Sequence, residues 1–320
     1  MKDLNTGTSA AAASTAAAAT TPAEPAAAPR SFARDLVMLT KPRIISLLLV
    51  TTIAPMFVAG RPSWWLVLVV TIGGYLMAGG ANAVNMYLDR DIDDVMSRTR
   101  LRPIPSGRLA ATSVVAFGVA LATAATFLLA HFANVLTAAL ALGGFYFYVF
   151  IYTRWLKRTT PQNIVIGGAA GAFPPLVGWA AVTGRIDLAA VYLFLIVFYW
   201  TPPHFWALAL LKQKDYGKAG VPMAPLVWGE RETMDQMLWY TLILVPLTLL
   251  PAAFGAFGAI YTVSAALLGG WLLVGVLRVR AADRRGEVWT KAAWSVYKFS
   301  LLYLALLFVA MVVDRQLLAR

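Results

Sequence analysis

The sequence contains no cysteine, only two histidines and few charged residues. Without cysteine the chain can form no disulfide, no thiolate metal site and no cysteine nucleophile. Charged residues make up 13% of the 320 positions, whereas about a quarter is usual for a soluble domain, and 60% of the residues are hydrophobic. These scarcities exclude a soluble globular domain and favour a protein embedded in a membrane.

Large apolar side chains are almost missing from residues 1–30, which consist mainly of Ala, Thr, Pro and Ser. Such a stretch cannot bury enough surface to offset the entropy lost on ordering. We therefore predict a disordered tail over residues 1–30, followed by a transmembrane domain over residues 31–320. A cleaved signal peptide is the alternative, but the weakly apolar run 10–19 contains no Leu or Phe and only Lys2 precedes it.

Apolar blocks of about twenty residues, the length that crosses the hydrocarbon core, recur along the rest of the chain. The pattern predicts an all-α polytopic membrane protein of about nine transmembrane helices. A break near Ala259 is required, because one helix across the seventh and eighth blocks would overspan any bilayer. The predicted spans are 43–60, 64–88, 109–130, 134–151, 161–181, 188–211, 236–258, 260–278 and 293–313.

The basic residues fall on one side of these spans. With the N-terminus in the cytoplasm, the cytoplasmic segments hold 22 of the 27 Lys and Arg residues. The other side holds four, and Lys298 lies just inside the last span, from where it can reach the cytoplasmic face. This asymmetry predicts an external C-terminus and explains the net charge of +12 without a nucleic-acid partner.

A row of polar side chains lies at the cytoplasmic end of the second span. Asn85, Asp89 and Asp93 are spaced by four, which places them on one helix face about 6 Å apart along the axis, whereas Asp91 points elsewhere. Acids at a membrane boundary are costly unless a partner compensates them. Magnesium held by a substrate phosphate is such a partner, since it takes one or two carboxylates and completes its shell with phosphate oxygens.

A basic cluster follows this acidic row directly. Arg98 and Arg102 also differ by four and would share a face on a helical turn. Guanidinium groups bind phosphate oxygens, often with two hydrogen bonds. The alternative is that these charges only solvate a loop and pair with one another, but the neighbouring acidic face favours a metal-bridged diphosphate site.

The sixth span contains the run TPPHFW, in which His204 follows Pro202 and Pro203. The prolines cannot donate hydrogen bonds, so we expect a break in the helix there. For His204 three roles remain open: a packed and hydrogen-bonded residue, a ligand to haem iron, or a proton carrier. Asp215 lies beyond this span among lysines, on the same cytoplasmic side as Asp89.

These motifs resemble those of the UbiA superfamily of intramembrane prenyltransferases, and within it the branch that acts on haem. The resemblance rests on Asn85-x-x-x-Asp89-x-x-x-Asp93, the RTRLRP run after it, YTRWLKR from Tyr152, and TPPHFWALAL with the later Asp215. It covers about residues 35–313. It implies a central cavity, a farnesyl diphosphate donor, protoheme IX as the acceptor, a magnesium requirement and a place in the inner membrane.

The resemblance also implies roles for individual residues. Metal ligation falls to Asn85, Asp89, Asp93 and Asp215; diphosphate contact also to Tyr152, Lys157, Lys212 and Lys214; and catalysis to Asp89, Asp93, Arg98, Arg102 and His204. The family pattern of the second acidic loop has an aspartate four residues before Asp215, where this chain has Leu211. Whether this loop binds its own magnesium therefore stays open, and Lys212 and Lys214 are expected to contact the diphosphate directly.

Two other functions compete with this expectation. The same machinery prenylates phenolic or quinone precursors in other enzymes of this type, and only the acceptor pocket differs; His204 and its segment favour haem. A transporter would bind ions near the middle of broken helices, whereas these acids lie at the cytoplasmic boundary. The sequence leaves open whether a downstream haem-modifying enzyme takes the product directly.

Overall fold

The computed structural model describes residues 31–318, and all regular structure in this range is helical. The predicted disordered tail, residues 1–30, lies outside the described residues. Within them, nine helical segments are long and apolar enough to cross a membrane, as predicted. They are α2 (Pro42–Ala59), α3 (Trp64–Leu88), α5 (Ala111–Phe132), the compound span Val135–Thr159, α8 (Asn163–Thr183), α9 (Leu188–Lys218), α11 (Glu230–Ala253), α12 (Ala259–Arg284) and α13 (Thr290–Leu318).

The predicted break near Ala259 is confirmed. A turn separates α11 from α12, and Gly255 occupies the left-handed region there with φ of 67°. The first turn of α12 is then capped from another helix, since the Asp314 carboxylate of α13 accepts hydrogen bonds from the backbone N–H groups of Gly258 at 2.6 Å and Tyr261 at 3.1 Å. A buried carboxylate is thereby matched to the positive end of a helix.

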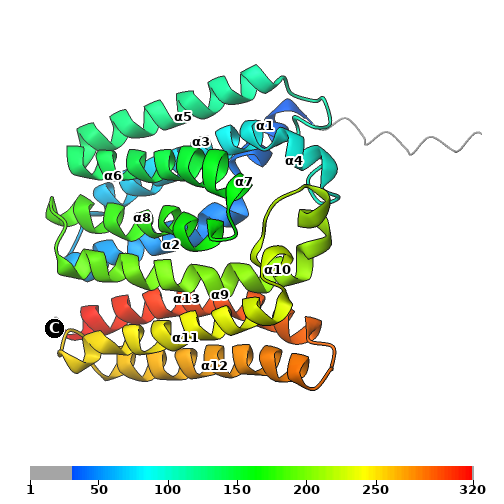
Figure 1. Ribbon diagram of the computed structural model, residues 1–320. Coiled ribbons are helices and arrows are strands. Elements are labelled where there is room, and N and C mark those ends of the chain that lie inside the picture. Colours follow the sequence, from blue (N-terminus) through cyan, green and yellow to red (C-terminus); the bar gives the residue numbers. More distant parts are fainter. Residues whose placement is uncertain (1–30, 319–320) are drawn as a thin grey trace, which may run out of the picture. The chain divides into compact units, whose positions relative to one another are not determined.

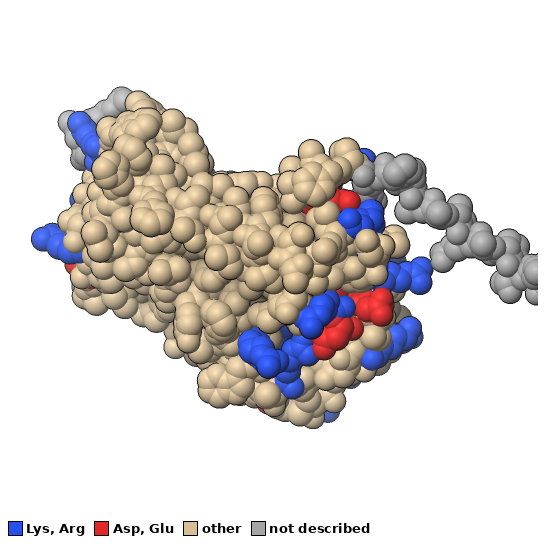
Figure 2. Space-filling model, turned by 90° about the horizontal axis from the view of Figure 1, so that it is seen from above, with Lys and Arg blue, Asp and Glu red and all other residues tan. Residues whose placement is uncertain are grey.

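Four short helices gather at one end of the bundle (Figure 1). They are α1 (Phe32–Thr40), α4 (Arg90–Val95), α7 (Lys157–Thr159) and α10 (Ala224–Val227). The C-terminal end of α13 lies at the opposite end. On the face seen in Figure 2, most charged side chains gather toward one end and a few lie at the other, with a broad uncharged surface between them, which suits a protein whose middle lies in lipid.

The first and last spans meet in the middle of the bundle. The helix α2 packs against α8 and α13, and α13 packs in turn against α9 and α12. Their core contains large, fully buried side chains such as Trp206, Tyr303 and Phe308. The last helix, α13, therefore lies against α9, the helix that carries the TPPHFW motif.

Two spans depart from ordinary helix geometry. The fourth consists of α6 (Val135–Tyr146), the π-helix η1 (Phe147–Leu156) and α7. In the sixth span the expected break at Pro202 and Pro203 is wrong, because α9 stays helical through them and only Lys212 has non-helical dihedral angles. Membrane helices tolerate proline where neighbouring groups satisfy the carbonyls that lose their helical partners.

Candidate active site

The acidic row forms at the junction between α3 and α4. The backbone N–H of Asp89 donates to the Asn85 carbonyl at 2.9 Å, and that of Asp93 donates to the Asp89 carbonyl at 2.7 Å. The spacing of four is therefore kept across the junction. All three side chains are buried, and the Asn85 amide donates to Asp89 Oδ2 at 2.8 Å. Asp91 lies off this face and is exposed.

Three cations from separate parts of the chain face this row. Lys157 Nζ, from α7, donates to Asp89 Oδ2 at 2.6 Å. Arg102, from the turn segment after α4, donates to Asp93 Oδ2 at 2.6 Å. Lys41 Nζ donates to Asn85 Oδ1 at 2.8 Å. The first two were predicted from the sequence, whereas Lys41 was counted only among the basic residues of the cytoplasmic side.

Lys41 has an unusual place between α1 and α2. Its backbone is left-handed, with φ of 55°, directly before Pro42 at the first position of α2. The pKa of its ammonium group is lowered to about 7, chiefly because burial disfavours the charged form and then because the Arg102 charge lies nearby. A cation held in this way is available for a strongly anionic ligand.

Arg158 ties the off-face acid to the row. Its guanidinium donates to both oxygens of Asp91 at 2.7 Å and to the Leu88 carbonyl at 2.7 Å. It also lies 3.9 Å from Asp89 Oδ1. The hydrogen bonds from Arg158 lower the pKa of Asp91 to about 2. Asp91 therefore fixes a fourth cation beside the buried row, a role that the helical spacing does not indicate.

The π-helix supplies the wall next to the row. Thr153 accepts a hydrogen bond from the Asn85 amide at 3.1 Å and donates to the Tyr148 carbonyl at 2.8 Å. Tyr148 and Tyr152 stack with ring centroids 5.7 Å apart. A Cβ at Gly167 of α8 would overlap the Tyr152 ring, so a glycine is needed there. Single π-helical turns are frequent at functional sites.

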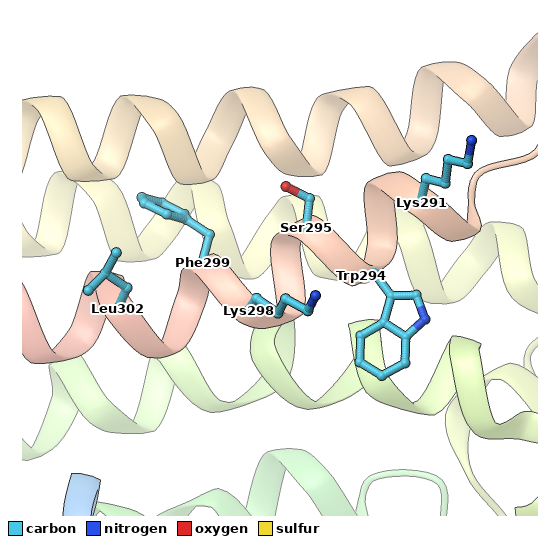
Figure 3. A pocket seen from close by; sticks show the side chains of 6 residues that line it. All are labelled: Lys291, Trp294, Ser295, Lys298, Phe299 and Leu302. Carbon is cyan, nitrogen blue, oxygen red and sulfur yellow. The ribbon is translucent and has the colours of Figure 1, made fainter.

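The second acidic loop meets the first through Asp215. Both of its carboxylate oxygens accept from the Ser97 hydroxyl, at 3.1 and 3.2 Å. Of the two lysines expected to contact the diphosphate, Lys214 is exposed, and Lys212 Nζ lies 5.8 Å from the Trp294 ring centroid. Figure 3 shows Trp294 on α13 near Lys298, at the edge of an open pocket.

Arg98 and Arg102 do not share a face, contrary to the sequence expectation. The segment after α4 forms turns rather than a helix. Arg102 pairs with Asp93, whereas Arg98 is exposed. The turns therefore place the two guanidinium groups in different surroundings.

His204 belongs to α9, and its ring packs against α13. Its ring stacks on Trp200 with centroids 4.4 Å apart and on Tyr297 with centroids 5.0 Å apart. Its Nδ1 is 2.7 Å from the Ser300 hydroxyl. These contacts agree with the packed and hydrogen-bonded role, one of the three that the sequence left open.

The described residues contain no group of three or more His, Asp or Glu side chains that could hold a metal ion. They do contain a buried carboxylate oxygen without a hydrogen-bond partner, Asp89 Oδ1. A buried acceptor of this kind is costly unless a cation or donor reaches it. Asn85 and Asp89 thus fit a magnesium ion that arrives with the phosphates of its ligand and shares their oxygens.

Comparison with known proteins agrees with this geometry. Residues 47–302 match the UbiA prenyltransferase family. A protein of Roseiflexus castenholzii named protoheme IX farnesyltransferase is 57% identical over 291 residues, which cover 90% of this chain. The chain belongs to the UbiA prenyltransferase family. It spans about half the length of the Roseiflexus relative, since the match covers 54% of that protein.

A second relative of the same name, from Symbiobacterium thermophilum, is 54% identical over 286 residues, covering 88% of this chain and 94% of that one. Solved UbiA-type structures share the fold. A digeranylgeranylglyceryl phosphate synthase superposes with a TM-score of 0.69 at 18% identity, covering 88% of this chain and 98% of that one. An Archaeoglobus fulgidus UbiA homolog bound to DMAPP and Mg2+ gives 0.60 at 15% identity, covering 87% and 99%. These similarities show that this multi-pass chain has the UbiA fold.

Proposed function

We propose that this protein transfers a farnesyl group from farnesyl diphosphate to a vinyl group of protoheme IX, giving haem O and diphosphate. The observation that carries the proposal is the 57% identity over 291 residues to a relative named protoheme IX farnesyltransferase. Relatives that match over nearly their whole length bear the same name. The acidic row and its cations supply the chemistry that such a transfer needs.

The donor half of the reaction takes place at the junction of α3 and α4. Asn85, Asp89 and Asp93 would hold magnesium together with the diphosphate, and the buried Asp89 Oδ1, which accepts no hydrogen bond, supports this assignment. When bound, magnesium supplies positive charge to the diphosphate oxygens. UbiA homologs with bound Mg2+ carry DMAPP or GPP, which are also prenyl diphosphates.

The cations of the site act on the leaving group. As the bond between farnesyl C1 and the diphosphate oxygen breaks, the electron pair stays on the diphosphate. Lys41, Lys157 and Arg102 already surround the row and can exchange their carboxylate and amide partners for diphosphate oxygens. Preorganised cations aimed at developing negative charge are a main source of catalysis. Arg158, held by Asp91, adds positive charge from the cytoplasmic side.

The acceptor half completes the reaction. The terminal carbon of the haem vinyl group forms a bond with farnesyl C1, and the positive charge moves to the vinyl carbon next to the porphyrin ring. Water adds there and loses a proton, which leaves a hydroxyethylfarnesyl side chain. The stacked Tyr148 and Tyr152 lie beside the donor site and stabilise the allylic cation through their ring faces. His204 serves the acceptor.

The site also separates this proposal from the alternatives. The acids lie at the end of α3 rather than in the middle of a broken helix, which disfavours ion transport. The Lys and Arg asymmetry supports an inner-membrane protein with a cytoplasmic N-terminus and site.

The direct test uses the purified full chain in lipid nanodiscs. Farnesyl diphosphate and magnesium are supplied with haem or with 4-hydroxybenzoate, and the products are identified by mass spectrometry. We expect a haem product heavier by one farnesyl group and one hydroxyl group, and none when magnesium is chelated. Prenylated benzoate in place of the haem product would assign the chain to phenol prenylation. Absence of both products would contradict prenyl transfer to either acceptor.

A further inference from the structure

We infer that Ser300 is a positioning residue that holds His204 as the neutral tautomer with its proton on Nδ1, so that the Nε2 lone pair serves as a ligand to the iron of the haem acceptor. The inference rests on the proposed function for the identity of the acceptor. The tautomer itself follows from hydrogen bonds within the protein and can be tested without any substrate.

The direction of the hydrogen bonds defines the tautomer. The Ser300 hydroxyl lies 2.7 Å from His204 Nδ1 and donates to the Tyr297 carbonyl at 2.9 Å. A hydroxyl has one proton, so an oxygen that donates to the carbonyl can only accept from the imidazole. His204 Nδ1 therefore carries the proton, and a neutral imidazole then has a lone pair on Nε2.

The ring is also held in one plane. Trp200, one turn earlier on α9, stacks on His204 with an angle of 13° between the ring planes, and Tyr297 of α13 stacks with an angle of 20°. The backbone of Ser300 is fixed in turn, because the Trp200 indole N–H donates to its carbonyl at 2.8 Å. Ser300 is 1% exposed. Two helices thus determine the direction in which Nε2 points.

Among the residues that the structure describes, the second ring nitrogen of His204, Nε2, has no hydrogen-bond partner, and it is not one of their fully buried polar atoms without a partner. Part of Nε2 is therefore exposed. Histidines that bind metals commonly donate their other N–H to a fixed oxygen, which sets the tautomer and strengthens the ligand. Ser300 with the Tyr297 carbonyl supplies that oxygen, and imidazole suits iron.

The chain offers a favourable experiment because it has only two histidines, His131 and His204. Protein labelled with 15N-histidine gives two imidazole spin systems, and a His131→Gln variant assigns them. We expect wild-type His204 to show a protonated Nδ1 and a bare Nε2. Ser300→Ala should give a mixture of tautomers, and Ser300→Thr, which keeps the hydroxyl, should restore the wild-type pattern.

Ser295→Ala is the matched control, because Ser295 is exposed on the same helix and points toward α12 in Figure 3. It should leave the His204 signals unchanged. A protonated Nε2 in the wild type would overturn the inference, as would an unchanged tautomer in Ser300→Ala. The wild-type measurement decides the tautomer even where Ser300→Ala fails to fold.

Haem titration of the same variants tests the iron ligand. Loss of a positioning partner typically weakens metal binding by about tenfold or more. We therefore expect Ser300→Ala to weaken haem binding by about that factor and to shift the haem absorption bands, with the binding of farnesyl diphosphate unchanged. Ser300→Thr and Ser295→Ala should match the wild type. Haem affinity and spectrum unaltered in both Ser300→Ala and His204→Ala would refute the ligand role, whereas farnesyl transfer to haem by the wild type would still stand.

Discussion

Binding of the diphosphate should be coupled to protonation of Lys41. The pKa of this lysine falls from its usual 10.5 to about 7 in the folded protein, first through burial and then through the nearby Arg102 charge. This fall corresponds to about 5 kcal/mol by which the empty site disfavours the ammonium form. A diphosphate brings several negative charges next to Lys41 and so raises the pKa again. Binding at pH values above about 7 must then take up a proton.

The sign of the pH dependence follows from linkage. Above pH 7 the free protein holds Lys41 increasingly neutral while the complex holds it charged, so diphosphate affinity should fall by up to about tenfold per pH unit. The stability of the ligand-free protein changes with pH in the opposite direction. Between pH 7 and 10.5 the unfolded chain binds more protons at Lys41 than the folded chain, so this residue makes the free energy of unfolding rise with pH across that window.

Titration calorimetry with a non-reactive thiodiphosphate analogue of farnesyl diphosphate measures the proton directly. At pH 8, with magnesium constant, two buffers of different ionisation enthalpy give the number of protons taken up. We expect about 0.9 from Lys41 in the wild type and about none in Lys41→Arg, whose guanidinium stays protonated. Arg43→Gln, at an exposed neighbouring position, should behave as the wild type. Equal proton uptake by the wild type and Lys41→Arg would refute the reasoning.

Three further results are expected. Asp89→Asn should lower turnover by a factor corresponding to about 3 kcal/mol or more in activation free energy, while the protein still folds. Asp91→Asn should lower turnover less. If a steady-state assay showed that both substitutions are tolerated equally, it would contradict a diphosphate site at the acidic row. Gly167→Ala should destabilise the protein by about 1–3 kcal/mol in thermal unfolding, because the added methyl group meets the Tyr152 ring. Gly171→Ala should not destabilise it, because a methyl group there enters open space. Similar losses of stability in both variants would exclude the ring contact as the cause. A reporter fused to the C-terminus should be active outside the cytoplasm, and cytoplasmic activity would mean that the chain crosses the membrane an even number of times.

The sequence alone determined the spans and the acidic row. Span length depends on bilayer thickness and the spacing of Asn85 and Asp89 on helix pitch, and both are local properties that a sequence shows directly. The break near Ala259 followed from the same length argument. The local rule failed at Pro202 and Pro203, because a helix inside a membrane protein tolerates prolines where neighbouring groups satisfy the carbonyls that lose their helical partners.

Tertiary structure decided which side chains complete the site. Lys41 reaches Asn85 across 44 positions of sequence, and Ser300 reaches His204 across 96. Neither partner is recognisable locally, since a lysine in a basic segment and a serine in an apolar helix are ordinary residues. Lys212, at the bend in α9, likewise lies 5.8 Å from the ring centroid of Trp294, a contact that no local pattern indicates. Helix periodicity fixes what lies on one face of one helix, but only packing fixes which face of another helix lies opposite.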